Sequence, residues 1–478
     1  MLQAAEEEVP AMNENTPMDR NAGFGRRGLL ATSVATLAVP IAARAQAPAA
    51  PAAAPAAGGQ SAVIDVNRAR TAPIPVAIPA FPGTGGQAQQ LGQNIAGVIT
   101  NDLARCGLFR AIDPASFIQG QPPANGTPDF NSWKMIGTQA LVTGKVADAG
   151  GGQVRVEFRL WDVLPQQQIQ GTAYTTAASN WRRIAHIIAD VIYQRLLGEK
   201  GYFDTRIAYI ATTGPQRHPI KRLAIMDQDG ANNRFLTSGR WMALTPRFHP
   251  TKDEIAFMSY VNRHPRVYLF DLGTGRRTLL GDFQGMTFSP RFSPDGSKVI
   301  MAVSRGGGSD IVVVDLGSGR STRLTDSGSI DVSPCYSPDG SQIVFNSDRG
   351  GDQQLYTMNA DGSNVKRISY GSGRYGSPVW SPRGDLIAFI RLGGQFAVGV
   401  MQPDGSGERI LSESYLVDGP TFCPNGRVLM FWRSTPASNA SGAGHSSSLV
   451  TIDITGFNER VLQTPTNASD PDWSPLLS

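Results

Sequence analysis

The chain has 478 residues, of which 17% are charged and 8% are aromatic. Its length exceeds that of one ordinary domain, and its composition is that of a globular protein that buries sizeable cores. The formal net charge of +4 is small for this size, and no stretch gathers Lys and Arg on one face. Nucleic acid is therefore not an expected partner.

The first 60 residues predict an export signal followed by a linker. Arg26 and Arg27 precede an uncharged run over residues 29–43, and Ala45 ends a small-x-small cleavage motif. This run is shorter than the ~20 residues that a membrane span needs. We therefore expect a signal peptide over residues 1–45, cleavage between Ala45 and Gln46, and an Ala/Pro-rich linker over residues 46–60. The paired arginines resemble a twin-arginine signal, so both that route and the general secretory route stay open.

Residues 61–200 combine strand and helix patterns and predict a small α/β domain. Extended segments are expected over residues 62–70 and 73–81, where Pro73, Pro75 and Pro79 suit a sheet edge. Alternating residues predict strands over 140–146 and 154–163. Apolar residues at helical spacing predict helices over 87–105 and 180–197, the second with Ser179 as its N-terminal cap.

From residue 201 onward, one short motif recurs at a nearly constant spacing. Its clearest copies are Phe292-Ser293-Pro294-Asp295-Gly296 and Tyr336-Ser337-Pro338-Asp339-Gly340. The aromatic residue that opens each copy occurs at positions 248, 292, 336, 380, 422 and 473. A period in the forties is typical of a repeat architecture.

Each repeat contains the pattern of four short strands. A short apolar run follows each aromatic residue, then an alternating strand that ends in Asp or Asn, and then a fourth strand after a turn. The Asp-Gly pairs at 295–296, 339–340 and 361–362 suit tight hairpin turns. Four strands in about 40–45 residues form one propeller blade.

The ends of the repeat array predict how the ring closes. The segment 206–227 has a second and a third strand without an aromatic-Ser-Pro strand, whereas Trp473-Ser474-Pro475 has no strands after it. Together the two fragments complete one blade. We therefore expect a six-bladed β-propeller over residues 201–478, closed by strand exchange between its ends, which removes the exposed sheet edges.

Loops that lead from the outer strand of one blade to the inner strand of the next should ring one mouth of the propeller channel. They carry apolar, aromatic and arginine side chains of the kind that protein interfaces favour. These are Trp241, Met242, Met286, Phe288, Arg374, Tyr375, Tyr415 and Leu416. The acidic residues Asp331, Asp418, Asp470 and Asp472 are expected in the loops before the inner strands, where they would make polar contacts with a partner.

Motifs for catalysis and metal binding do not stand out in the sequence. The three cysteines are expected to be buried free thiols, and none of the five histidines has a ligand-spaced mate. No Gly-x-Ser-x-Gly elbow is present. We therefore expect no cofactor, no metal and no catalytic residue. One alternative stays open: a propeller lyase or glycosidase that uses the four acidic residues on an envelope polysaccharide.

Taken together, residues 60–478 resemble the TolB family of the Tol–Pal cell-envelope system. The resemblance is carried by the six repeats, by the proline-rich opening over residues 73–81, and by the junction Gly201-Tyr202-Phe203-Asp204-Thr205-Arg206. It implies a monomeric, non-enzymatic adaptor in the periplasm, which reaches membranes only through its partners.

The resemblance also implies particular partners and residues. The propeller mouth would bind the peptidoglycan-associated lipoprotein Pal, and the mature N-terminus would bind the inner-membrane protein TolA. The system constricts the outer membrane during cell division, and other outer-membrane proteins are further candidate partners. Carried over by position, the Pal-facing residues include Met286, Thr287, Ser289 and Val332. Because a linker precedes the domain, the TolA-binding segment is either Gln46 onward or residues 61–70.

Overall fold

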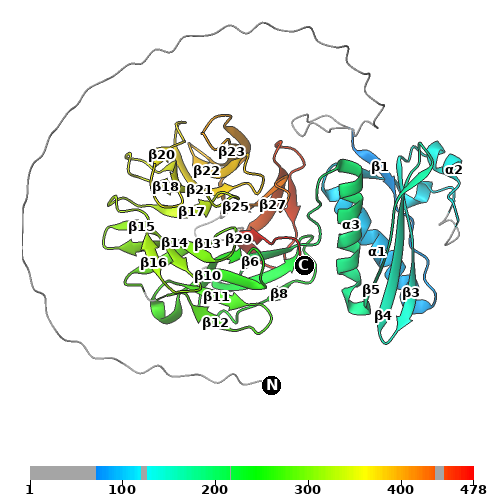
Figure 1. Ribbon diagram of the computed structural model, residues 1–478, viewed down its shortest axis with the longest axis horizontal. Helices are drawn as coiled ribbons and strands as arrows, with labels where there is room; N and C mark the ends of the chain where they lie inside the picture. Colours follow the sequence, from blue (N-terminus) through cyan, green and yellow to red (C-terminus); the bar gives the residue numbers. More distant parts are fainter. Residues whose placement is uncertain (1–71, 120–125, 216, 282, 437–445, 478) are drawn as a thin grey trace, which may run out of the picture. The chain divides into compact units, whose positions relative to one another are not determined.

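The computed structural model describes residues 72–119, 126–215, 217–281, 283–436 and 446–477, which belong to one packed unit. Figure 1 shows two architectures among these residues: a small α/β domain and a six-bladed β-propeller. The expected signal peptide, its cleavage site, the linker and the extended segment over 62–70 lie outside the described residues.

The α/β domain is a five-stranded mixed sheet with strand order β2-β1-β3-β4-β5. Its strands are β1 (Ile74–Ala77), β2 (Phe109–Ala111), β3 (Ala140–Gly150), β4 (Gln153–Asp162) and β5 (Gln167–Ala177). Its helices are α1 (Gly86–Arg105), α2 (Phe130–Met135) and α3 (Trp181–Leu197). Strand β1 runs parallel to β2 and β3, whereas β3, β4 and β5 form an antiparallel meander.

Helices α1 and α3 form where the sequence predicts them, and Figure 1 shows both along one face of the sheet. Their apolar residues recur at helical spacing, so each helix buries one stripe against the strands. Helix α1 buries Ile95, Ile99 and Leu103 completely, and α3 does the same with Ile188 and Ile192. These side chains share one core with the inward faces of β3 and β4.

Two expectations for this domain are corrected by the structure. Ser179 does not cap α3, because it lies in a short 3-10 turn and Asn180 occupies the cap position without a side-chain hydrogen bond. Strand β1 is not at an edge, since it pairs with β2 and β3. Pro75 is tolerated there because β1 pairs over only a few residues and the Pro75 carbonyl still accepts a bond from Gln139 N at 3.0 Å. The sequence patterns also missed β2, α2 and β5.

The propeller consists of six four-stranded antiparallel sheets, as the repeat predicts. In five blades the strands follow the chain order from the inner to the outer strand. Two of these blades are β9 (Ala243–Phe248), β10 (Glu254–Ser259), β11 (Arg266–Asp271) and β12 (Arg277–Leu279), and then β13 (Met286–Phe292), β14 (Lys298–Arg305), β15 (Gly308–Asp315) and β16 (Ser321–Arg323). The next three are β17 (Val332–Tyr336), β18 (Gln342–Ser347), β19 (Gln354–Asn359) and β20 (Lys366–Arg367); β21 (Arg374–Trp380), β22 (Ile387–Leu392), β23 (Phe396–Met401) and β24 (Arg409–Ser414); and β25 (Leu416–Phe422), β26 (Val428–Ser434), β27 (Ser447–Asp453) and β28 (Arg460–Leu462).

The remaining blade joins the two ends of the propeller, which confirms the predicted closure. Its strands are β29 (Asn467–Trp473), β6 (Arg206–Thr213), β7 (Ile220–Asp227) and β8 (Arg234–Phe235), in that order. Strand β29 pairs antiparallel with β6, in a register that sets Trp473 opposite Ile207. The Trp473 indole Nε1 also donates to Thr205 Oγ1 at 2.8 Å, so backbone and side chain both hold the closing strand.

Each aromatic anchor ends an inner strand, and the Ser-Pro-Asp-Gly residues after it make the turn to the second strand. In the blade that starts with β13, Ser293 Oγ donates to Asp295 Oδ1 at 2.5 Å and accepts from Lys298 N at 3.0 Å. Gly296 adopts φ 71°, a left-handed conformation that glycine adopts without steric cost. The motif thus closes a hairpin by side-chain to backbone bonds, which is why it recurs with the blade period.

A second periodic feature lies inside the inner strands. Three residues before each aromatic anchor, the backbone is left-handed, and a proline follows: the positions are Thr245, Ser289, Ser333, Ser377, Gly419 and Asp470. The pairing register shifts at this point in every inner strand. Because proline has no N–H to donate to the ladder, the strand bulges where the proline falls.

The three cysteines, Cys106, Cys335 and Cys423, are buried free thiols, as the sequence predicts. Within the described residues, none of the helices has both the length and the apolar character that crossing a membrane requires.

Candidate partner-binding site on the propeller

The two ends of the propeller channel carry different connections. In each blade the turns between first and second strands and between third and fourth strands lie at one end, because the strands are antiparallel. The loops that connect one blade to the next lie at the other end, and we call this end the rim. The predicted partner-binding residues all belong to the rim or to the inner strands directly below it.

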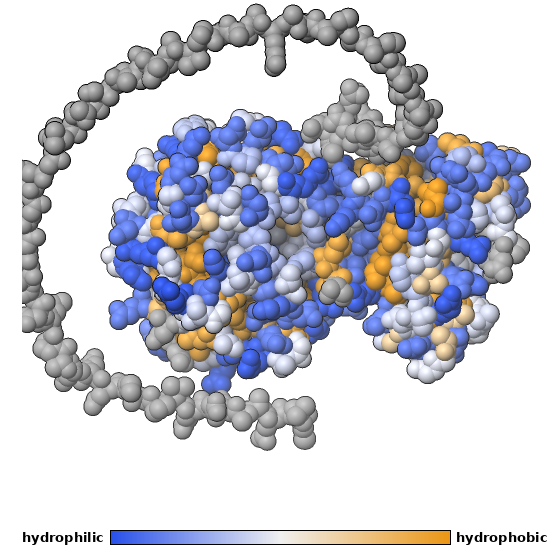
Figure 2. Space-filling view, in the orientation of Figure 1, coloured by the Kyte–Doolittle hydropathy of each residue, from blue (hydrophilic) through white to orange (hydrophobic). Residues whose placement is uncertain are grey.

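One position of the repeat gives the rim an apolar character. The residues six positions before the aromatic anchors are Met242, Met286, Ile330, Arg374, Leu416 and Asn467, and four of these six are apolar. Met286 is 48% exposed and Ile330 is 43% exposed, at equivalent positions of neighbouring blades. Figure 2 shows one face of the molecule, on which hydrophilic side chains predominate and apolar patches lie between them. Apolar side chains held in solvent at a ring of equivalent sites favour protein binding.

Most of the predicted rim residues are accessible. The Arg374 side chain is 66% exposed and lies 3.4 Å from Asp352. Trp241 and Met242 are half-buried, and the Arg240 guanidinium lies over the Trp241 ring at 5.4 Å. Ser289, at the bulge of β13, and Val332, the first residue of β17, are also half-buried. These residues are available for contact with a partner.

Three predicted residues instead point into the propeller and hold it together. Thr287 is fully buried, and its Oγ1 accepts from Val267 N at 2.9 Å. Asp331 is also fully buried and forms an ion pair with Arg349 at 2.8 Å. Tyr375 is 1% exposed, and its hydroxyl donates to Glu408 at 2.9 Å. We therefore assign these residues a structural role beneath the rim.

The remaining predicted carboxylates sit where neighbouring inner strands meet. Asp418 Oδ1 accepts from Ser377 Oγ and from Gly419 N, both at 2.7 Å. Asp470 accepts from Ser469 Oγ at 3.0 Å, and burial raises its pKa, with the nearby Asp418 charge acting in the same direction. Both carboxylates are half-buried. The Ser377 bond of Asp418 joins two adjacent blades, whereas the Ser469 bond of Asp470 stays within β29. Asp418, Asp470 and Asp472 lie within inner strands and not in the loops that the sequence predicts.

At the end of the channel opposite the rim, the last two residues of each inner strand and the turns that follow them line a cavity of about 400 Å³. The lining residues directly before the aromatic anchors are Arg247, Arg291, Cys335, Val379, Thr421 and Asp472. Asp472 accepts from Phe248 N at 2.7 Å and lies 3.8 Å from Arg247. Burial raises the pKa of Asp472 and lowers that of Arg247 to about 10. Asp472 therefore fixes the closing strand to the next blade.

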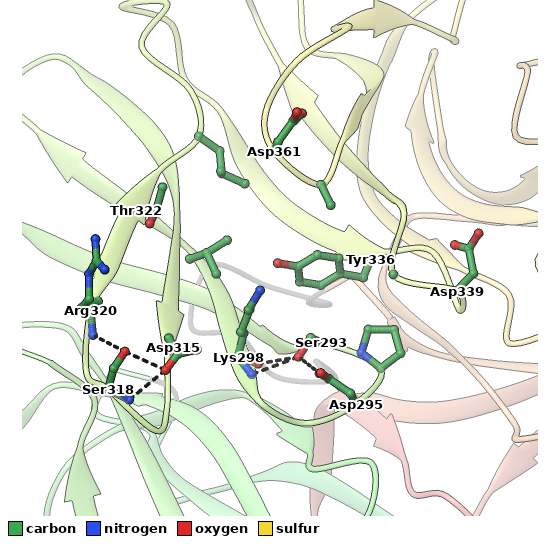
Figure 3. Close-up of a pocket in the computed structure, with 15 residues that line it drawn as sticks. Ser293, Asp295, Lys298, Asp315, Ser318, Arg320, Thr322, Tyr336, Asp339 and Asp361 are labelled. Carbon is green, nitrogen blue, oxygen red and sulfur yellow. Dashed lines mark hydrogen bonds between the residues drawn. The ribbon is translucent and has the colours of Figure 1, made fainter.

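A polar groove of about 680 Å³ lies between two blades at the end opposite the rim (Figure 3). Its carboxylates come from four turns: Asp295, Asp315, Asp339 and Asp361. Hydrogen bonds from neighbouring serine residues lower the pKa of Asp295 and of Asp339 to about 2. These carboxylates are ionised groups that stabilise turns, whereas a carboxyl group that acts as a general acid needs a raised pKa.

Three exposed rim residues were not singled out from the sequence. Ile330 occupies the same repeat position as Met286, so the period alone could have found it. Tyr370 is 70% exposed where the outer strand of its blade ends, and Tyr260 is 37% exposed in the loop between β10 and β11. No periodic signal marks these two tyrosines, because loop residues vary from blade to blade.

Fold and rim together define a class of protein: a six-bladed propeller that follows a small α/β domain and presents an apolar ring for contacts. Family models describing the TolB amino-terminal domain and the TolB beta propeller domain match residues 62–169 and 193–477, respectively. The chain belongs to the TolB family.

Individual relatives agree with this assignment along nearly the whole chain. The Tol-Pal system protein TolB of Gluconobacter oxydans is 60% identical over 95% of this chain and 96% of its own length. Its counterpart from Paramagnetospirillum magneticum is 59% identical over 87% of this chain and 93% of its own. The crystal structure of TolB from Acinetobacter baumannii is similar with a TM-score of 0.72 at 28% identity, covering 85% of this chain and 97% of that one.

Proposed function

We propose that this protein is a non-enzymatic periplasmic adaptor of the Tol–Pal system that binds the lipoprotein Pal through the rim of its propeller. The observation that carries the proposal is the 60% identity to a Tol-Pal system protein TolB over nearly the full length of both chains. The exposed apolar ring at Met286 and Ile330 provides a surface of the right chemistry. Such an adaptor needs only a rigid scaffold with a binding surface.

A second contact belongs to the N-terminal side of the chain. In this proposal, export removes residues 1–45, and a segment within 46–70 binds TolA while the rim binds Pal. The adaptor would thereby connect an inner-membrane protein with a lipoprotein of the outer membrane. This connection is the basis of the proposed role in outer-membrane integrity and in constriction during cell division.

The Pal contact can be tested with one charge substitution at the rim. Met286→Arg places a charge where a partner would exclude water, and we expect it to weaken Pal binding by at least about tenfold, or about 1.4 kcal/mol. Isothermal titration of purified Pal into the mature chain measures the change. The melting temperature should stay near that of the unaltered protein, because the Met286 side chain is 48% exposed.

Met135→Arg is the matched control, since Met135 is 72% exposed on α2 of the α/β domain. It should leave Pal affinity unchanged. If the unaltered protein fails to bind Pal, the adaptor proposal is wrong. If Met135→Arg weakens binding as much as Met286→Arg does, the rim is not the binding surface.

The alternative of a propeller lyase or glycosidase gains no observation in its favour. Its candidate carboxylates, Asp331, Asp418 and Asp472, each accept hydrogen bonds or form ion pairs that join parts of the propeller. The decisive measurement would be turnover of an envelope polysaccharide that disappears in Asp331→Asn.

A further inference from the structure

One histidine of the α/β domain faces two aspartates of the propeller. His186 lies on α3, Asp227 ends β7, and Asp229 lies two residues later in the turn toward β8. One imidazole nitrogen and one oxygen from each carboxylate lie within 4.8 Å of one another. No ligand-spaced partner of His186 is visible in the sequence, because 41 residues separate it from Asp227 and the packing of α3 against the first blade brings the two together.

The environment of His186 leaves one nitrogen without a partner. The side chain is 3% exposed, and its Nδ1 lies 2.6 Å from Asp102 Oδ2. Nε2 is also buried, and it has no hydrogen-bond partner among the described residues. When Nδ1–H donates to a carboxylate, the Nε2 lone pair is free, and metal-binding histidines are commonly oriented in this way.

The supporting residues around the cluster are themselves fixed. Asp102 is fully buried, and its second oxygen, Oδ1, accepts from Gln228 Nε2 at 2.7 Å. Asp229 Oδ1 accepts from Ala231 N at 3.2 Å within its own turn. The Asp227 side chain is 18% exposed and that of Asp229 is 10% exposed. The donors are thus held in place from both domains.

Arg182 is the positive group already at this position. It forms an ion pair with Asp229, and its Nε lies 3.4 Å from Asp227 Oδ2. The contacts of Asp227 with Arg182 and Asn232 both involve Oδ2, so Oδ1 is left for a further ligand. Asp102, Asp227 and Asp229 place three carboxyl groups around the imidazole, and carboxylate oxygens are ordinary ligands of divalent cations.

The corresponding residue in the next blade makes different contacts. Asp271 lies 44 residues after Asp227 and ends β11 in the same way that Asp227 ends β7. Its Oδ1 accepts from Gly273 N at 2.9 Å and from Thr274 N at 2.7 Å, so it caps its own turn. Asp227 instead faces α3 and Arg182.

We infer that His186, Asp227 and Asp229 bind a divalent transition-metal ion of the zinc type between α3 and the first blade. One imidazole nitrogen and two carboxylate oxygens suit Zn²⁺, with water in the remaining position. Bonds of about 2.1 Å bring two ligand atoms to at most about 4.2 Å apart, so the side chains must close by roughly half an ångström. The bound ion would tie the α/β domain to the propeller, a role beyond the proposed adaptor function.

The test is titration of Zn²⁺ into the chelator-treated mature chain, followed by calorimetry. We expect one strong site per chain and a melting temperature that rises with Zn²⁺ but not with Mg²⁺, because a ligand of the folded state stabilises it. Bound Co²⁺ should give visible absorption bands of a site with nitrogen and oxygen ligands. If excess Zn²⁺ produces no binding, the inference is overturned.

Two variants locate the site. His186→Asn keeps a donor near the position of Nδ1 for Asp102 but removes Nε2, and Asp227→Asn removes one carboxylate. Each should weaken Zn²⁺ binding by at least about tenfold, whereas Asp271→Asn should leave it unchanged. Binding that persists in both variants would place the ion elsewhere and overturn the inference. If His186→Asn does not fold, Asp227→Asn and the Co²⁺ spectrum of the unaltered protein still decide.

Discussion

At the scale of single residues, two aspartates show how the repeated motif stabilises its turns. Asp295 Oδ1 accepts from Ser293 Oγ at 2.5 Å and from Ser297 N at 3.0 Å, and Asp339 makes the same bonds with Ser337 and Ser341. Hydrogen bonds to the ionised carboxylate, first of all from Ser293 and Ser337, lower both pKa values to about 2.

These shifts predict how stability depends on acid. Since the folded-state pKa lies below the ordinary value of 3.8, ionised Asp295 and Asp339 stabilise the fold above pH 4, and this contribution is lost as the pH falls from about 4 to about 2. The double variant Asp295→Asn/Asp339→Asn should therefore lose less stability over this range. Melting temperatures recorded from pH 5 to pH 2 measure it.

Asp253→Asn is the control for this measurement, because Asp253 is exposed in the corresponding turn of the preceding blade, which lacks the Ser-Pro-Asp-Gly sequence. Its acid profile should match that of the unaltered protein. Equal acid profiles for the double variant and the unaltered protein would show that the turn carboxylates do not contribute.

Single residues also show why the rim could be predicted only in part. The repeat places Met286 and Thr287 at the start of the same inner strand, but successive side chains of a strand point to opposite sides. Met286 is 48% exposed and Thr287 is fully buried. The sequence identified the segment, but the direction of each side chain depends on the register and on the bulge.

At the scale of elements, strong periodicity separates what the sequence predicted from what it missed. The second strand of each blade is a continuous apolar run between turn residues, so its pattern was clear. Strand β5 (Gln167–Ala177) is polar along most of its length and none of its residues is fully buried, so no apolar pattern marks it. Strand β2 has three residues, too few for any period to show.

The bulged inner strands were also missed, although a proline two residues before every anchor marks them. Five of the six left-handed positions are not glycine, and such backbone costs about 1–3 kcal/mol in each case. The sixth position is Gly419, with φ 63°, and glycine adopts this left-handed conformation without steric cost. The ring therefore retains strain at equivalent points around the channel.

This strain predicts opposite effects of two substitutions at Ser333, whose φ is 53°. Ser333→Val should lower the free energy of unfolding by about 1–3 kcal/mol, because a branched side chain crowds left-handed backbone. Ser333→Gly should change it by less than about 1 kcal/mol, because relief of strain and the greater chain entropy of glycine offset each other. Urea denaturation measures both.

Ser321→Val provides the comparison, since Ser321 is exposed in the outer strand β16. It should change the free energy of unfolding by no more than about 0.5 kcal/mol. If Ser333→Val were as mild as this control, the left-handed backbone would not be the reason for small or polar residues at these positions.

At the scale of the whole molecule, the same periodicity predicted six blades and their closure from both ends of the array. The contact between His186 and Asp227 could not be predicted in this way, because it depends on how one helix packs against the first blade. A sequence repeat predicts how each blade packs against its neighbouring blades. It does not predict contacts between two different domains, because the residues at those contacts do not recur with the repeat.

Closure of the ring depends on a strand at the end of the chain. Besides its pairing with β6, β29 is anchored by Ser474 N donating to Arg206 O at 2.9 Å and by Trp473, which is 7% exposed against Tyr202. Deletion of Asp470–Ser478 removes most of this inner strand and opens the first blade. We expect a large fall in the melting temperature, measured by calorimetry, because β6 loses the strand that pairs with it.

Two further variants distinguish the effect of losing strand β29 from the effect of losing single side chains or the last residues of the chain. Trp473→Ala keeps the strand backbone but empties the anchor position, and should cost about 3–5 kcal/mol. Deletion of Leu476–Ser478 leaves β29 complete and should have a much smaller effect, because among the described backbone hydrogen bonds it removes the one from Leu477 N to Asp204 O. If deletion of Asp470–Ser478 were as mild as the shorter deletion, the terminal strand would not hold the ring closed, and the six blades would draw their stability from contacts between neighbours alone.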